Sequence, residues 1–417
     1  MPALEARILL IGNELVEGRL ADRNGSFLAA ELSELGFVVS EIRVLPDDPT
    51  RLRAAMREAL QSEARLILSS GGLGHTIDDL TAALWAEVIG DTLTLSESLL
   101  ERLRLALERR GIASLPYLER YALVPTQGEA LLNPVGLAPA LYWEKGLQVI
   151  CALPGPPAEL QAIWHTHLKP RLLSRFPVAP PLHFTLRTTG ITESVVSQLL
   201  EAWEKQLPQD FRLAYNPSWE GVTLHLRAPA GTDADAFFSQ VEQLKSILQP
   251  YIYGEGQVLL AEAILHRLKA AGLTLAVAES CTGGHLAAEI VNIPGASEIF
   301  LGGIVSYANS AKMQLLGVSE ETLRTEGAVS EATAIQMAEG VKRALGAEVG
   351  VSTTGIAGPS GGSPEKPVGT VWFGIATPWS TEARRYTFPG NRQVVIQRAT
   401  ATALSLLWQA LQKQPVP

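Results

Sequence analysis

Three side chains that can act as nucleophiles follow one another at Ser280, Cys281 and Thr282, within the stretch 277–284 that follows the apolar run 273–276. That run is typical of a buried strand, and the glycine-led, alanine-rich segment behind it is typical of a helix. If the helix begins at Ser280, the next three N–H groups, up to Gly283, are unpaired in its first turn. Such a junction suits a nucleophile that attacks a carbonyl carbon, because these N–H groups can stabilise the oxyanion. A serine in this place can also be no more than a helix N-cap.

A second group of residues with chemical potential lies between a strand-like run and a helix-like run in the first part of the chain. Gly71, Gly72 and Gly74 allow backbone N–H groups to approach a phosphate closely, and the helix start behind them favours an anion. Asp78 and Asp79 follow, and two carboxylates would repel a phosphate unless a divalent cation lay between them. Asp78 can alternatively be a simple cap of the following helix.

Composition limits the class of protein. The chain has 417 residues, 47% of them hydrophobic, which is enough for two or three domains. The 34 lysines and arginines stand against 43 aspartates and glutamates, a net charge of -9 without a basic block, so we expect no nucleic-acid partner. No apolar stretch reaches the ~20 residues of a membrane span and no signal peptide is recognisable, so we expect a cytoplasmic protein with no membrane partner. Cys151 and Cys281 lack metal-ligand spacing.

Strand-like and helix-like runs alternate through the first part of the chain. The strand-like runs are 7–12, 37–45 and 65–72, and the helix-like runs between them are 24–36 and 51–64. This alternation predicts a parallel sheet covered by helices, with ligands bound beyond the carboxyl ends of the strands.

We expect three domains, with boundaries near a proline-rich stretch and a short linker. The first covers 1–172, a small α+β module covers 173–254, and the third covers 255–417, where polar motifs again follow strand-like runs. The predicted fold is therefore α/β, with two parallel-sheet domains flanking a small α+β module. A homodimer is the expected assembly, because twofold dimers are the commonest oligomers.

Four ordered motifs, at 11–25, 69–81, 133–140 and 152–160, resemble the amino-terminal domain of the CinA (competence/damage-inducible) family, which is similar to molybdopterin-binding proteins. The resemblance implies hydrolysis of the pyrophosphate of ADP-ribose, with a divalent metal (Mg²⁺ or Co²⁺) and K⁺ as cofactors. By resemblance, the substrate-binding residues are Asn24, Gly72, Gly74, Asn133 and Gly136. The metal ligands that it implies are Glu14, Asp48, Asp78, Asp79 and Glu159, and Asp79 is also catalytic.

Three motifs at 278–284, 305–312 and 354–362 resemble the carboxy-terminal CinA domain, which is similar to nicotinamide-nucleotide amidases. This resemblance runs from about 258 to 411 and implies conversion of nicotinamide mononucleotide (NMN) to nicotinate mononucleotide and ammonia, without a cofactor. An amide is a poor electrophile, so its hydrolysis needs an activated nucleophile, a base and oxyanion donors.

Ser280 is the expected nucleophile and Lys312 the expected base, because no histidine lies in these motifs. The positive end of the helix that opens near Asn309, together with burial, would lower the pKa of Lys312. Tyr307 could hydrogen-bond the amine or the substrate. Cys281 lies one position too far along and should pack against the sheet as a small apolar group.

Four more residues are expected to hold the substrate of the third domain. They are Thr282 and Gly283 in the turn, Thr354 as a hydroxyl, and Arg392 as the partner of the NMN phosphate, the last two by resemblance. The chain is thus expected to be a bifunctional hydrolase of pyridine-nucleotide salvage. Two alternatives remain: a front domain that binds molybdopterin or a nucleotide without catalysis, and an accessory protein of DNA uptake.

Overall fold

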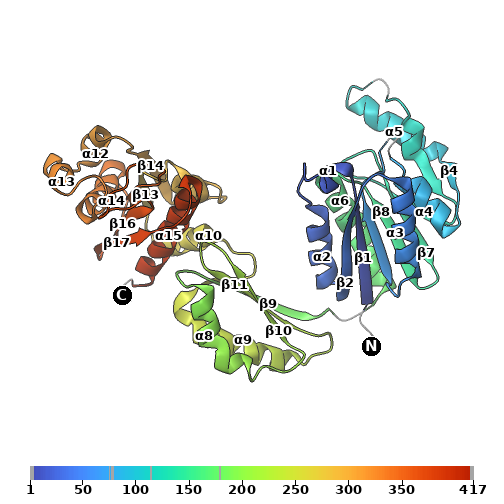
Figure 1. The fold of residues 1–417 in the computed structure, drawn as a ribbon, viewed down its shortest axis with the longest axis horizontal. Coiled ribbons are helices and arrows are strands. Elements are labelled where there is room, and N and C mark those ends of the chain that lie inside the picture. Colours follow the sequence, from blue (N-terminus) through green and yellow to red (C-terminus); the bar gives the residue numbers. More distant parts are fainter. Residues whose placement is uncertain (1–3, 75, 77–78, 113–114, 178–179, 414–417) are drawn as a thin grey trace. The chain divides into compact units, whose positions relative to one another are not determined.

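The computed structural model describes residues 4–74, 76, 79–112, 115–177 and 180–413. The chain divides into two compact units, which are described separately (Figure 1). The first unit holds residues 1–181 with 229–231, and the second holds 182–228 and 232–417. The predicted small module therefore shares a unit with the carboxy-terminal part of the chain, although it has a hydrophobic core of its own.

A six-stranded sheet forms the centre of the first unit. Its order is β2 (Phe37–Leu45), β1 (Leu4–Ile11), β3 (Leu66–Ser70), β8 (Gln148–Leu153), β7 (Ala140–Lys145) and β6 (Gly128–Leu131). The first four strands run parallel, as the alternating sequence pattern predicted, and the last two are antiparallel. The sheet is therefore mixed rather than wholly parallel.

Helices cover both faces of this sheet. One face packs against α2 (Asn24–Glu34), α6 (Pro157–Ile163), η2 (Trp164–Leu168) and α7 (Lys169–Arg175), and the other against α3 (Pro49–Gln61) and α4 (Thr81–Ile89). Along β1, Ile8 and Leu10 enter the first core and Leu9 and Ile11 the second. A strand buried on both faces needs such a continuous apolar run, because successive side chains point to opposite sides.

Further short elements complete the first unit. They are α1 (Asn13–Val16) after β1, the antiparallel pair β4 (Leu93–Leu95) and β5 (Leu123–Pro125), α5 (Glu97–Arg109) and η1 (Leu118–Ala122). Leucines of α5 and η1 form a small hydrophobic cluster of their own. Ser96 caps α5 by accepting a hydrogen bond from the N–H of Leu99.

The small module is an antiparallel sheet with two helices. The strand order is β10 (Arg212–Pro217), β11 (Val222–Ala228), β9 (Leu182–Thr188) and β12 (Ile252–Glu255). The helices are α8 (Glu193–Glu204) and α9 (Ala234–Leu248), the latter followed by η3 (Gln249–Tyr251). The α+β prediction for this segment is thus confirmed.

A five-stranded sheet forms the centre of the carboxy-terminal part. Its order is β14 (Phe300–Val305), β13 (Leu275–Glu279), β15 (Val349–Gly355), β16 (Thr370–Ala376) and β17 (Thr381–Thr387). β14, β13 and β15 run parallel, whereas β16 and β17 are antiparallel. The carboxyl ends of the three parallel strands therefore meet at one edge.

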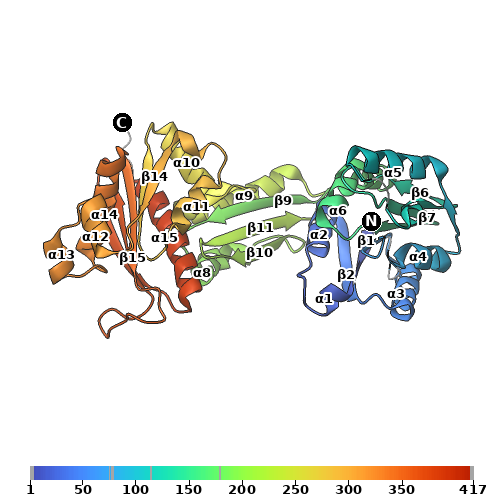
Figure 2. The ribbon, with the colours of Figure 1, turned by 90° about the horizontal axis from the view of Figure 1, so that it is seen from above.

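Two groups of helices cover this sheet (Figure 2). On one face lie α10 (Leu260–Ala270), α11 (His285–Val291) and α15 (Arg392–Gln412), with η4 (Ala296–Glu298); on the other lie α12 (Asn309–Leu316), α13 (Glu320–Thr325) and α14 (Glu331–Leu345). Val277 of β13 faces the first group, and Ala276 and Ala278 face the second. No helix of the described ranges is long and apolar enough to cross a membrane.

Candidate functional site

A serine and a lysine contact each other at the carboxyl edge of the parallel strands in the second unit. The Nζ of Lys312 lies 3.1 Å from the Oγ of Ser280. Ser280 follows β13 directly, and Lys312 ends the first turn of α12. Both residues are buried, with 8% of Ser280 and 1% of Lys312 exposed. The two residues that the sequence suggested as nucleophile and base therefore lie within hydrogen-bonding distance.

The amine of Lys312 is surrounded by neutral groups. Its Nζ donates to the carbonyl oxygen of Ser306 at 2.6 Å and lies 3.4 Å from that of Tyr307. No ion pair links it to a carboxylate among the residues that the structure describes. Burial lowers the pKa of Lys312 below its ordinary value. A lysine with a lowered pKa is neutral often enough to accept a proton.

Strand geometry turns Cys281 away from this lysine. Side chains alternate along β13, so Val277 and Cys281 enter one core while Ala278 and Ser280 face the helices on the other side. Cys281 is 5% exposed, and burial raises the pKa of its thiol to about 12. The thiol is therefore protonated at neutral pH and far less nucleophilic than a thiolate.

The helix after Ser280 begins later than the sequence suggested. Residues 281–284 form a turn, and α11 begins only at His285. The N–H of Gly283 donates to the carbonyl oxygen of Ser280 at 3.2 Å. The expectation that Gly283 offers an oxyanion donor was therefore wrong, and the N–H groups of Cys281 and Thr282 are the ones that directly follow the nucleophile.

A buried carboxylate holds the turn in place. Glu279, the last residue of β13, is 1% exposed. Its two oxygens accept hydrogen bonds of 2.9 to 3.1 Å from the N–H groups of Gly284, Leu286 and Ala287. A carboxylate at a helix N-terminus satisfies N–H groups that have no partner within the helix and interacts favourably with the helix dipole. The turn that carries Ser280 is therefore fixed at both its ends.

The two threonines proposed as substrate contacts already have protein partners. The Oγ1 of Thr282 lies 2.7 Å from that of Thr353 in the core, so the Thr282 hydroxyl has a structural role. The Oγ1 of Thr354 donates to the carbonyl oxygen of Ala328 at 2.6 Å. Thr354 lies on the same face of the sheet as Ser280, and its oxygen retains a lone pair for a substrate donor.

Arg392 connects two of the predicted motifs. It begins α15, and its guanidinium donates to the carbonyl oxygen of Gly358 at 3.0 Å and to the hydroxyl of Tyr307 at 3.1 Å. The Tyr307 hydroxyl therefore contacts Arg392, and only the Tyr307 carbonyl faces Lys312. The expected contact between this hydroxyl and the amine is not found. Tyr307 instead orients a cation beside the Ser280 site.

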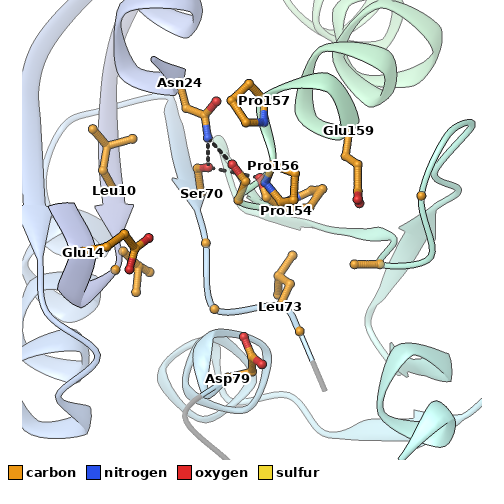
Figure 3. A pocket seen from close by; sticks show the side chains of 18 of the residues that line it. Leu10, Glu14, Asn24, Ser70, Leu73, Asp79, Pro154, Pro156, Pro157 and Glu159 are labelled. Atoms are coloured by element: carbon orange, nitrogen blue, oxygen red, sulfur yellow. Dashed lines mark hydrogen bonds between the residues drawn. The ribbon is translucent and has the colours of Figure 1, made fainter. Parts of the chain in front are cut away.

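The first unit contains a pocket of about 810 Å³ at the carboxyl ends of β1, β3 and β8. Glu14, Asp79 and Glu159 stand on three sides of it (Figure 3). Asn24 closes another side, where its side-chain amide donates to Ser70 at 2.9 Å and to the carbonyl oxygen of Gly155 at 2.7 Å. Gly72, Gly74 and Gly136 also line the pocket. The sequence motifs of this unit thus meet in one cavity.

The carboxylates of Glu14, Asp79 and Glu159 each lie over a glycine. The pairs are Gly12 with Glu14, Gly74 with Asp79, and Gly136 with Glu159. A Cβ atom on any of these glycines would collide with the paired carboxyl group. The glycines therefore leave the space in which the carboxylates sit.

The pocket carboxylates suit a hard cation without forming a ready-made cage. Asp79 accepts hydrogen bonds from the N–H and hydroxyl of Thr76 at 2.8 and 2.7 Å, and Glu159 accepts one of 2.6 Å from Asn133. No three potential ligands converge within the described residues. Mg²⁺ is commonly held by one or two carboxylates together with substrate phosphates, so the residues fit such an ion. Asp78, another expected ligand, lies outside the described residues.

Two residues of the expected set do not line this pocket. Asn133 lies behind the wall, where it bonds Glu159. Asp48 is the N-cap of α3 and accepts a hydrogen bond of 2.8 Å from the N–H of Arg51. It therefore caps a helix, and the expectation that it is a metal ligand of this pocket is corrected. Its neighbour Asp47 lines the pocket instead. Pro49, at the first helical position, was the signal that Asp48 is a cap.

The sequences of known proteins match all three parts of the chain. Residues 7–174 match the family described as a probable molybdopterin binding domain, 183–254 the damage-inducible protein CinA KH domain, and 258–411 the CinA C-terminal domain. A CinA-like protein of Salinibacter ruber is 41% identical over 404 residues, which cover 96% of this chain and 98% of the relative. The chain belongs to the CinA family.

Other CinA relatives match over different lengths. A CinA-like protein of Amoebophilus asiaticus is 35% identical over 420 residues, covering 98% of this chain and all of that protein. The crystal structure of a competence damage-inducible protein A from Klebsiella pneumoniae is 36% identical, covers 37% of this chain and 97% of its own, and has a TM-score of 0.37. The pair Ser280 and Lys312 lies in the CinA C-terminal domain, and the carboxylate pocket lies in the molybdopterin-binding-like domain.

Besides Asp47, sequence reasoning also missed Tyr121 and Arg110 in the pocket wall of the molybdopterin-binding-like domain. Tyr121 lines the pocket, and its pKa is raised by burial first and then by the charges of Asp79 and Glu159. Arg110 also lines it, and it donates to the carbonyl oxygen of Val135 at 2.8 Å. Both residues lie between the CinA motifs, in a stretch with no distinctive spacing, so no sequence signal identified them.

The opposite orientations of Ser280 and Cys281 give a first prediction. A fluorophosphonate probe should label Ser280 in the wild type and in Cys281→Ala, because the thiol faces the core. Cys281→Ala should lower the free energy of unfolding by about 1 kcal/mol through a small cavity. Peptide mass spectrometry and urea unfolding measure the two effects. Ser280→Ala is the negative control, and loss of labelling in folded Cys281→Ala would contradict the assignment.

Proposed function

We propose that the CinA C-terminal domain hydrolyses the carboxamide of NMN to nicotinate mononucleotide and ammonia. The observation that supports this proposal is the buried contact of 3.1 Å between Lys312 Nζ and Ser280 Oγ, in surroundings that lower the lysine pKa. A serine hydroxyl beside a neutral lysine is an activated nucleophile, because the amine can accept its proton. The similarity of the sequence motifs to nicotinamide-nucleotide amidases supports the choice of substrate.

The proposed reaction uses Ser280 and Lys312 in two half-reactions. The Oγ of Ser280 forms a bond to the carboxamide carbon while its proton passes to Lys312 Nζ. The C–N bond then breaks, and the nitrogen takes that proton and leaves as ammonia. Water attacks the resulting ester with Lys312 again as base, which releases the acid and restores Ser280. The N–H groups of Cys281 and Thr282 would stabilise the negative oxygen in both steps.

Arg392 is the proposed partner of the substrate phosphate. Its guanidinium is held between Gly358 and Tyr307 near the carboxyl edge of the sheet, so little side-chain freedom is lost on binding. Arginine matches the geometry of phosphate oxygens well. Thr354 offers a buried hydroxyl oxygen on the same face of the sheet as Ser280.

We further propose that the first unit hydrolyses the pyrophosphate of ADP-ribose. The supporting observation is the pocket of about 810 Å³ with Glu14, Asp79 and Glu159 around it, which is large enough for a nucleotide. Asp79 and Glu159 would hold a divalent cation such as Mg²⁺ or Co²⁺, with K⁺ as a further cofactor. When bound, the metal would neutralise phosphate charge. The glycine turn at Gly72 and Gly74 would face the phosphates.

Two rival functions make different predictions. A front domain that only binds molybdopterin or a nucleotide would release no AMP from ADP-ribose. A DNA-uptake accessory protein should bind nucleic acid, and two observations count against this. The chain carries a net charge of -9. Residues 183–254, which match a KH domain, contain no Gly-x-x-Gly sequence, the loop with which KH domains clamp a nucleic-acid backbone. A salt-dependent gel shift at physiological ionic strength would favour this second rival.

We propose a homodimer, which light scattering tests.

Variants of Lys312 test the proposed base. Deamidation of NMN should rise with pH through a lysine pKa lowered by burial, because only the neutral amine accepts the proton. Lys312→Arg keeps the charge but cannot lose a proton in this range. Its turnover of NMN should therefore fall as far as that of Lys312→Ala and Ser280→Ala, by on the order of 10³-fold or more. Ammonia release measures this. Near wild-type turnover of Lys312→Arg would make Lys312 a phosphate anchor.

Metal removal separates the two proposed activities. Chelation with EDTA should stop AMP release from ADP-ribose and leave ammonia release from NMN unchanged, because the Ser280 site uses no metal. Asp79→Asn should abolish the first reaction and keep the second within a few-fold, since the sites lie in separate cores. Asp48→Asn is the matched control, because this residue caps α3 outside the pocket. Loss of both reactions in folded Asp79→Asn would refute the two-site proposal.

A further inference from the structure

One buried hydroxyl beside the Ser280 site has no assigned role. Ser306 is 0% exposed, and its Oγ has no hydrogen-bond partner among the described residues. A buried hydroxyl without a partner lowers the stability of the fold, because it gives up its hydrogen bonds to water. In a native protein such a group is rare and often has a functional role. The backbone of the same residue is fully engaged, since its N–H donates to the carbonyl oxygen of Glu279 at 2.8 Å and its carbonyl accepts from Lys312.

The strand register brings Ser306 alongside the nucleophile. β14 and β13 are parallel, with Val305 opposite Glu279, so Ser306 is opposite Ser280. Residues in register on neighbouring strands point to the same face of a sheet, and this is the face that packs against α12. The carbonyl oxygen of Ser306 is 2.6 Å from Lys312 Nζ, and only four covalent bonds separate it from the hydroxyl of the same residue.

The hydrogen bonds of Lys312 change when it takes a proton. The ammonium has three N–H donors, and the carbonyl of Ser306 satisfies one of them well. The contact of 3.4 Å to Tyr307 lies beyond the usual range of N–H···O bonds. While Lys312 holds the proton of Ser280, the Oγ of Ser280 is bonded to the carboxamide carbon and is a poorer acceptor. The protonated lysine therefore lacks good partners at the stage when it carries a charge.

We propose that the Ser306 hydroxyl is a positioning residue that accepts a hydrogen bond from Lys312 while Lys312 is protonated. The hydroxyl would turn toward the amine by rotation about its Cα–Cβ bond. The proposal deepens the Ser280 and Lys312 mechanism and rests on it. Ser306 does not touch the substrate: it stabilises the charged form of the base between the two proton transfers.

The other ionisable groups near Lys312 leave this role open. Cys281 is neutral below a pH of about 12, because burial raises its pKa. The Glu279 carboxylate is engaged with the start of α11 on the opposite face, and the Tyr307 hydroxyl binds Arg392. The buried residues of α14, which also packs here, carry no charge; they are Thr333, Ala334, Met337, Ala338, Gly340 and Val341.

Ser306→Ala tests the proposal against a matched control, Ser352→Ala. Ser352 is equally buried on the same face of the sheet, but its hydroxyl bonds the carbonyl oxygen of Ala334 at 2.6 Å and the N–H of Gly374 at 3.1 Å. Ser306→Ala removes an acceptor for the charged amine, so the pKa of Lys312 should fall by about one unit. The rising limb of the pH profile for NMN should move equally to lower pH, and plateau kcat should fall several-fold with KM little changed.

Stability should change in the opposite sense in the two variants. Ser306→Ala deletes an unpartnered hydroxyl and should keep or raise Tm, whereas Ser352→Ala breaks two hydrogen bonds and should lower Tm without moving the pH limb. Ser306→Thr keeps a hydroxyl and should keep the wild-type limb. If the rising limb of the pH profile does not move in Ser306→Ala, or if Tm falls as it does in Ser352→Ala, Ser306 has a structural role only.

A direct titration separates this proposal from the proposed function. In protein labelled with ¹³C at lysine Cε, the Lys312 signal is identified by its absence in Lys312→Arg. A lower pKa in Ser306→Ala than in wild type supports the hydrogen bond even if NMN is not the substrate. An equal pKa in both overturns it even if NMN is deamidated.

Discussion

The arrangement of the second unit depends on one unusual condition: an amine buried in a protein interior without a carboxylate beside it. Removing a charged group from water is unfavourable, so Lys312 is held where loss of its proton costs least, among carbonyl oxygens and a serine hydroxyl. Strand ends supply these oxygens, because main-chain carbonyls there are no longer all used by the sheet. A Glu or Asp at this place would keep the lysine charged and idle.

The same region shows how far local sequence determines a catalytic turn. Ser280 and Lys312 were recognisable because each follows an apolar strand, and parallel strands bring their carboxyl ends together. The start of α11 was not recognisable. Gly283 and Gly284 adopt positive φ angles, and the side chain of Glu279 caps the helix from the strand before the turn. Such a cap depends on tertiary position, and no short spacing rule encodes it.

In the first unit, the sequence predicted the parallel strands and the cavity at their ends, but not every residue of its wall. Strands buried on both faces carry long apolar runs and are easy to recognise. Asp47 and Asp48 are adjacent and chemically identical, and only the helix start after Asp48 separates the pocket residue from the cap. Tyr121 and Arg110 reach the pocket from a separate layer around α5, so their placement required the three-dimensional structure.

The fit of three carboxylates over three glycines has a consequence for how this pocket can vary in evolution. At Gly12, Gly74 and Gly136 the obstacle to a larger residue is the neighbouring acid, joined at Gly136 by Asn133, rather than the backbone conformation. Alanine at one of them would push the paired carboxyl group out of the position that it holds in the pocket. Each glycine and its acid should therefore change together among homologues, and an alignment would show three coupled pairs around one cavity. In a chain with both members of a pair replaced, that acid would no longer contribute to the pocket.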